Sequence, residues 1–157
     1  MPPPGTLASV EQFRRLHDPA FHRIAAHVGI LPPFEPSDAN VLDLFDAAAL
    51  PPRFTAEFGA PAAVGRALVL PLTGGAREGL ALQAALARLL LGPADAGPAL
   101  APALRIGLFS SDAEMEMARR ALTSLESPPG FGVTEVSLLL EDLRGLWHPV
   151  RSLRLAN

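Results

Sequence analysis

AAHVGILPPF, residues 25–34, is the stretch of this 157-residue chain that says most about its fold. The segment is apolar apart from His27, and it ends in a Pro-Pro-Phe corner. A run of apolar residues closed by prolines favours a strand that stops at the corner. We therefore expect a strand over residues 25–31. His27 is either a half-buried structural histidine bonded to a carbonyl or a group with a chemical role.

Helical and strand patterns alternate on both sides of this segment. Residues 9–16 form an amphipathic pattern, with Val10, Phe13 and Leu16 on one face. Ser37 or Asp38 is the expected cap of the next helix. Further helices are expected over residues 78–91 and 112–125. Strands are expected over residues 53–58, 67–72, 103–109, 131–140 and 146–155.

A segment rich in Gly, Pro and Ala, residues 92–102, is the only plausible internal boundary. Residues 1–157 are most simply a single domain. Within it, we expect two lobes, at about residues 1–92 and 103–157, joined by this linker. The order of elements predicts an α+β fold in which each lobe is an antiparallel sheet with helices packed on its outer face.

Composition excludes several kinds of function. The chain has no cysteine, so it has no disulfide, thiol nucleophile or thiolate metal ligand. All of its thirteen basic residues are arginine, and sixteen acidic residues bring the net charge to −3. Any patch that attracts polyanions must therefore be local. The chain starts with neither a basic region nor an apolar run, and residues 80–91 are too short to span a bilayer, so we expect a cytoplasmic protein without a membrane segment.

Three segments together resemble signatures of a known superfamily. His27 followed by Pro33-Phe34 is similar to the first His-x-Thr-x signature of the two-histidine (2H) phosphoesterases, which include 2′-5′ RNA ligase-like proteins and cyclic phosphodiesterases. Residues 15–19, Arg-Leu-His-Asp-Pro, resemble the Arg-x-x-x-Asp-Pro that precedes this signature in many members. Residues 102–106, Pro-Ala-Leu-Arg-Ile, match the place of the second signature.

The resemblance implies a site that has lost groups. In the family, each signature aims a histidine and a hydroxyl at one phosphate across a cleft. Here the four corresponding positions hold His27, Gly29, Ala103 and Arg105. One proton carrier and both hydroxyls are missing. Arg105 can bind phosphate oxygens with its guanidinium fork but cannot shuttle a proton. Alternatively, Arg105 points outward and pairs with an acid such as Glu135.

The leading hypothesis is therefore a degenerate 2H phosphoesterase, or pseudoenzyme, that binds a phosphate-bearing ligand such as a nucleotide or RNA terminus with little or no catalysis. One alternative is an active cyclic phosphodiesterase, a hydrolase in which His148 supplies the second group. Another is a non-catalytic structural or interaction protein. We expect no cofactor and no metal. Residues 1–8 leave little room for a first strand, so an exposed edge of the first lobe would allow a homodimer.

Overall fold

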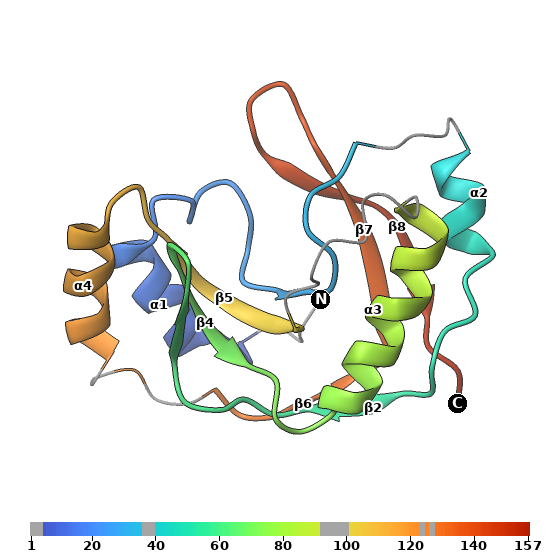
Figure 1. Ribbon diagram of the computed structural model, residues 1–157, viewed down its shortest axis with the longest axis horizontal. Helices are drawn as coiled ribbons and strands as arrows, with labels where there is room; N and C mark the ends of the chain where they lie inside the picture. The colour runs from blue at the N-terminus through green and yellow to red at the C-terminus, as the bar shows by residue number, and fades with distance from the viewer. Residues whose placement is uncertain (1–4, 36–39, 92–100, 123–124, 126–127) are drawn as a thin grey trace.

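The computed structural model describes residues 5–35, 40–91, 101–122, 125 and 128–157. They form two lobes that lie side by side and are connected along one end by β2 and β6 (Figure 1). The helices are α1 (Ala8–His17), α2 (Val41–Asp46), α3 (Ala76–Leu90) and α4 (Asp112–Ala121). The strands are β1 (Val28–Gly29), β2 (Phe54–Ala56), β3 (Ala62–Val64), β4 (Ala67–Pro71), β5 (Ala103–Leu108), β6 (Phe131–Val133), β7 (Glu135–Glu141) and β8 (Trp147–Arg154). The predicted two-lobed α+β fold is confirmed.

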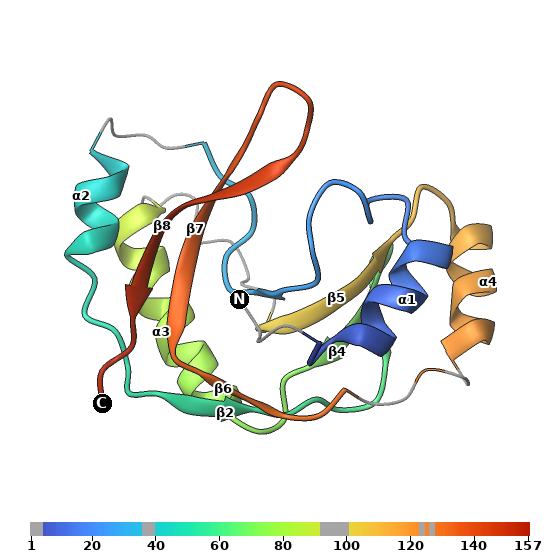
Figure 2. The ribbon, with the colours of Figure 1, turned by 180° about the vertical axis from the view of Figure 1, so that it is seen from behind.

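The first lobe is an antiparallel sheet of strand order β1-β5-β4-β3. Alternate residues of β4 and β5 point into one core, where Leu68, Leu70, Leu104 and Ile106 are buried. Helices α1 and α4 pack on that face, on the outside of the molecule (Figure 2). The opposite face of the sheet therefore carries the half-buried residues of the same strands, and these include the signature positions.

The second lobe combines two short antiparallel pairs, β2-β6 and β7-β8. A parallel bridge between Pro52 and Ala156 connects the pairs. Helices α2 and α3 cover them, and Phe45, Leu82, Leu86 and Val136 form the centre of this second core. The far end of the β7–β8 hairpin projects beyond the rest of the lobe (Figure 2).

The lobes do not follow the boundary expected at residues 92–102, of which 92–100 lie outside the described residues. Strand β5 comes after that segment, yet it lies between β1 and β4, which come before it. The second core likewise combines α2 and α3 with β7. Both lobes are therefore assembled from both halves of the chain, because their strands pair with partners that are distant in sequence.

Several expected elements differ in length from the structure. The strand expected over residues 25–31 is limited to β1, and the strand expected over 131–140 is divided into β6 and β7. Helix α4 ends at Ala121, four residues before the expected position, and Leu16 is exposed instead of buried. The expected caps of α2, Ser37 and Asp38, lie outside the described residues, and Asn40 occupies the N-cap.

The edges of the first sheet are β1 and β3, and every residue of β3 is exposed. Residues 5–7 form a turn that leads into α1, so residues 5–8 contain no strand. The homodimer through an edge of this lobe stays a prediction. None of the described helices is both long enough and apolar enough to pass through a membrane.

Candidate functional site

The four signature positions lie on two strands that pair directly. Strands β1 and β5 are antiparallel, with Val28 opposite Leu104 and Gly29 opposite Ala103. Extending this register by one residue places His27 opposite Arg105. Residues directly opposite on antiparallel neighbours point to the same face of the sheet. His27, Gly29, Ala103 and Arg105 therefore share one face, called the signature face below.

The arrangement of the two strands differs from the expected one. We expected them to face each other across a cleft, but they are hydrogen-bonded neighbours in a single sheet. The side chains converge because antiparallel pairing in this register relates the two signatures by an approximate twofold axis. Each histidine position is thus opposite the hydroxyl position of the other signature.

Alternation along β5 separates the signature face from the core. Leu104 and Ile106 are fully buried beneath α1, whereas Ala103 and Arg105 point to the other side and are half-buried. On the neighbouring strand β4, Val69 lies opposite Arg105. The signature face is thus partly shielded from water, and charges on it are screened less than on an open surface.

The tautomer of His27 follows from its hydrogen bond. Its Nδ1 lies 2.9 Å from the carbonyl oxygen of Ala25. Because a carbonyl only accepts, Nδ1 carries the proton, and Nε2 of the neutral ring keeps its lone pair. Burial lowers the pKa of His27 below 6.5, the bond to Ala25 opposes this, and the charges of Arg105 and Arg14 lower it further. At neutral pH His27 is therefore an uncharged hydrogen-bond acceptor.

Arg105 is a half-buried cation. Among the described residues it has no hydrogen bond or ion pair, so the alternative pairing with Glu135 is not found in that part of the chain. Burial lowers the pKa of Arg105, Asp18 opposes this, and the nearby charges of Arg14 and Arg23 lower it further. A guanidinium nonetheless stays protonated in proteins. A partly desolvated cation near other cations is stabilised by a bound anion.

The other two positions contribute space rather than chemistry. A Cβ atom added at Gly29 would meet no atom within 4 Å, and the side chain of Ala103 ends at its methyl group. The signature face thus offers one hydrogen-bond acceptor, one fixed positive charge and room for a ligand beside them. Of its four residues, His27 is the one that can exchange a proton near neutral pH.

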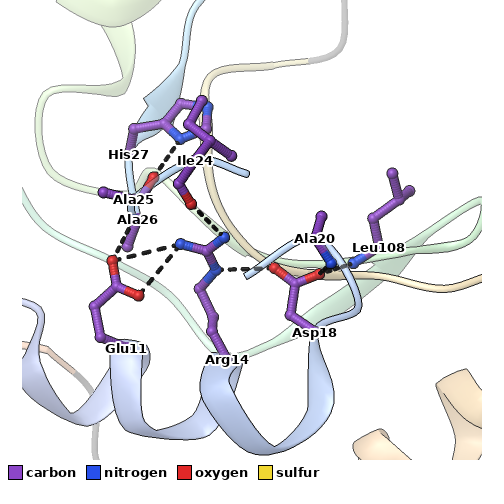
Figure 3. Close-up of polar contacts among 9 residues, drawn as sticks. All are labelled: Glu11, Arg14, Asp18, Ala20, Ile24, Ala25, Ala26, His27 and Leu108. Carbon is purple, nitrogen blue, oxygen red and sulfur yellow. Dashed lines mark hydrogen bonds and ion pairs between the residues drawn. The ribbon is translucent and has the colours of Figure 1, made fainter. Parts of the chain in front are cut away.

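A buried polar network holds His27 in position (Figure 3). Arg14 donates through Nε to Asp18 at 2.9 Å and through a terminal nitrogen to the carbonyl of Ile24 at 2.8 Å. Glu11 accepts a hydrogen bond from the backbone N–H of Ala26. Helix α1 thereby fixes the backbone on both sides of Ala25, whose carbonyl orients the imidazole.

Sequence reasoning missed this network. The resemblance to the Asp-Pro motif places its arginine at Arg15, but Arg15 is exposed and the partner of Asp18 is Arg14. Glu11, Arg14 and Asp18 are spaced three and four residues apart, which places them on one helical face. That spacing is the signal that could have identified them.

His148, the expected accessory residue, lies in the second lobe at the start of β8. Its Nε2 lies 3.0 Å from Oδ2 of Asp142, and His148 and Ala25 line the same pocket. No hydrogen bond connects His148 to His27 in the described part of the chain. Over the same residues, no group of three or more His, Asp or Glu side chains is placed to hold a metal ion.

The lowered pKa of His27 makes stability depend on pH. As pH falls below 6.5, the unfolded chain binds this proton before the folded chain does. The free energy of unfolding should therefore decrease on acidification until the folded ring also protonates. Urea unfolding between pH 7.5 and 5 is expected to show a weaker decrease for His27→Gln than for the unsubstituted chain. The exposed His22→Gln variant is the control, and an identical slope for His27→Gln would contradict the buried, neutral state.

Comparison with known proteins identifies a family for most of the chain. A family model described as the 2′-5′ RNA ligase superfamily matches residues 2–145. That range includes β1, β5 and the network on α1, and it ends just before β8. No curated protein matches the chain.

Proposed function

The chain belongs to the 2′-5′ RNA ligase superfamily, and on that premise we propose that it is a degenerate member that binds a phosphate-bearing ligand. The ligand class is a nucleotide or an RNA terminus, and catalysis is weak or absent. The observation that carries the proposal is Arg105, a half-buried guanidinium without a partner among the described residues, opposite His27 in the register of β1 and β5.

Binding follows from complementary chemistry. The Arg105 fork matches two phosphate oxygens, and such a contact is stronger where water is partly excluded. Nε2 of His27 accepts a hydrogen bond from a ligand hydroxyl or a protonated phosphate oxygen. Gly29 has open space where a Cβ would stand, and Ala103 carries only a methyl group.

Weak catalysis follows from what the same positions lack. Cleavage of a cyclic phosphodiester needs one group to take a proton and another to give one. His27 is the single such group at the signature positions, and each missing acid or base typically costs about 10²–10⁴ in rate. Gly29 and Arg105 stand where the family has the hydroxyl donors for the charge that builds on the phosphate.

Replacing Arg105 tests the binding site. Calorimetric titration with inorganic phosphate and with 3′-AMP is expected to show about 10- to 150-fold weaker binding for Arg105→Ala, because a charged hydrogen bond contributes about 1.5–3 kcal/mol. Arg119→Ala makes the same charge change on the exposed outer helix α4 and is the matched control. If Arg105→Ala binds phosphate and 3′-AMP as tightly as the unsubstituted chain does, Arg105 is not part of the site. Absence of any binding would favour the structural or interaction protein.

Turnover of 2′,3′-cyclic AMP, measured in the same preparations, distinguishes the pseudoenzyme from the active hydrolase. Feeble turnover is the expected result. Robust turnover that disappears in both His27→Ala and His148→Ala would establish the active cyclic phosphodiesterase instead. Turnover that survives His27→Ala would point to a contaminant or to another site.

A further inference from the structure

The end of the β7–β8 hairpin, residues 139–149, is called the tip below. The structure describes all of these residues, and none of them is fully buried or belongs to either hydrophobic core. The side chain of Leu138 still packs in the second core, whereas Leu140, two residues further along β7, is 62% exposed. Figure 2 shows this end of the hairpin projecting beyond the second lobe. The tip therefore adds little to the stability of either core.

Hydrogen bonds inside the tip make it a unit with a fixed shape. Oδ1 of Asp142 accepts from the backbone N–H groups of Arg144 at 2.8 Å and of Leu146 at 2.9 Å. The backbone N–H of Asp142 donates to the carbonyl of Leu146 at 2.9 Å, and Oδ2 of Asp142 lies 3.0 Å from Nε2 of His148. Because these bonds converge on one residue, the tip keeps its shape without help from its surroundings.

The connection between the tip and the rest of the hairpin is weak. Leu138 lies opposite Arg151, but Leu139 lies opposite Pro149. Val150 is therefore an extra residue in β8, and such a bulge bends the strand and leaves the extra residue unpaired. Pro149, beside the bulge, has no backbone N–H to give to the ladder. The hairpin thus has a hinge where the tip begins.

Arg23 connects the tip to the first lobe. Its Nε donates to the carbonyl oxygen of Gly145 at 3.0 Å, and its Nη2 pairs with Oε1 of Glu141. Its own carbonyl accepts from the backbone N–H of Trp147 at 2.9 Å. Among the described residues, these are the hydrogen bonds and ion pairs that join the tip to the first lobe. The side chains of Arg23 and Glu141 are 51% and 37% exposed, so water and salt weaken their attraction.

We propose that Arg23 is a latch and that the tip is a lid, which opens about the bulge at Leu138 and Leu139 while both cores stay folded. A segment outside the cores that is held by a few exposed contacts opens at a lower free energy than the domain unfolds. Opening removes one wall of a pocket of about 450 Å³, which residues 146–148 line from the tip and residues 21–25 line from the first lobe. The latch therefore controls access to that pocket.

Amide hydrogen exchange measured by NMR tests the lid, because the N–H of Trp147 bonds across to the first lobe. In the unsubstituted chain, the protection factor of this amide is expected to be at least about 100-fold lower than that of Leu86, which is buried in α3. Raising the salt concentration from about 0.05 M to about 1 M should lower it further, because the ion pair is screened. Equal protection of Trp147 and Leu86 would mean that the tip opens only when the whole protein unfolds, and that there is no lid.

Arg23→Met removes the latch and keeps the backbone carbonyl that Trp147 bonds. The protection factor of Trp147 is expected to fall by a further factor of at least about three, and its salt dependence to disappear. Leu86 and Asp142 should keep their protection, because the core and the inside of the tip do not depend on the latch. Arg144→Met, which removes an exposed arginine from the tip itself, is the matched control.

Reversing the ion pair separates the latch from a general effect of losing Arg23. Arg23→Glu alone should lower the protection of Trp147 more than Arg23→Met does, because it places two carboxylates together. Adding Glu141→Arg should recover part of this loss, since the pair forms again with opposite charges. No recovery would mean that the ion pair is not the latch.

The remaining outcomes also decide. If Arg23→Met and Arg144→Met lower the protection of Trp147 equally, Arg23 is not the latch. If Asp142 loses protection together with Trp147, the tip unfolds instead of moving as a unit, and the lid is wrong. Circular dichroism verifies that the variants are folded, and the comparison of Trp147 with Leu86 in the unsubstituted chain needs no variant.

Discussion

Replacement of Arg14 by methionine is expected to lower the free energy of unfolding by about 3–5 kcal/mol, because it leaves a buried charge without its partner. Arg14 and Asp18 have side-chain exposures of 1% and 0%, and their contact is 2.9 Å long. The expected loss is a large fraction of the roughly 5–15 kcal/mol that is the usual free energy of unfolding of a domain.

The effect should extend beyond the ion pair. Arg14 also bonds the Ile24 carbonyl, and Asp18 accepts from the backbone N–H groups of Ala20 and Leu108 (Figure 3). Arg14 therefore connects α1 to the loop before β1, while Asp18 connects it to the end of β5. Methionine fills much of the same volume but restores none of these bonds.

Urea unfolding at neutral pH measures the loss. Arg15→Met is the matched control, since Arg15 is the exposed neighbour on the same helix and surface changes usually stay within about 0.5 kcal/mol. Similar stabilities for the two variants would mean that the network does not hold the first lobe together.

The triple substitution Gly29→Thr, Ala103→His and Arg105→Thr is expected to raise turnover of 2′,3′-cyclic AMP by at least about 10²-fold, because it restores a second proton carrier. The register of β1 and β5 supports the design. The histidine introduced at position 103 would lie opposite position 29, and the threonine introduced at position 105 would lie opposite His27. A Cβ atom at position 29 would meet no atom within 4 Å.

The two histidines would then be diagonal neighbours on one face, at a separation of about 7–8 Å that is somewhat smaller between their Cβ atoms, which leaves room for a phosphate between their rings. The activity should stay below that of a natural enzyme, since residues supporting the new side chains are not rebuilt. Adding His27→Ala to the triple variant is the control and should abolish the gain. A gain that survives this change, or no gain in a folded triple variant, would contradict the geometry of the signature face.

The sequence alone determined the elements whose signals are local. Apolar spacing identified α1, and apolar runs identified β4 and β5. The order of the short signatures identified the superfamily. Such signals can be detected in the sequence because side-chain periodicity and turn chemistry depend on neighbouring residues and not on the rest of the chain.

Tertiary structure alone decided how the elements are combined. Nothing local in residues 103–108 indicates that β5 pairs with β1 on one side and β4 on the other. The exposed strand β3 was missed because Ala62, Ala63 and Val64 show no alternation of polar and apolar residues. Strand pairing joins segments that are distant in sequence, so its partner and register depend on the whole fold.

The same reason explains why β1 is only two residues long. Before it, the backbone of Ile24 and Ala26 bonds to the side chains of Arg14 and Glu11, and after it the carbonyl of Ile30 accepts from Gln83. An apolar pattern predicts a strand but cannot tell which groups will satisfy its backbone. Helices from both lobes provide those groups here, because backbone polar groups that are buried on folding must find partners wherever the fold places them.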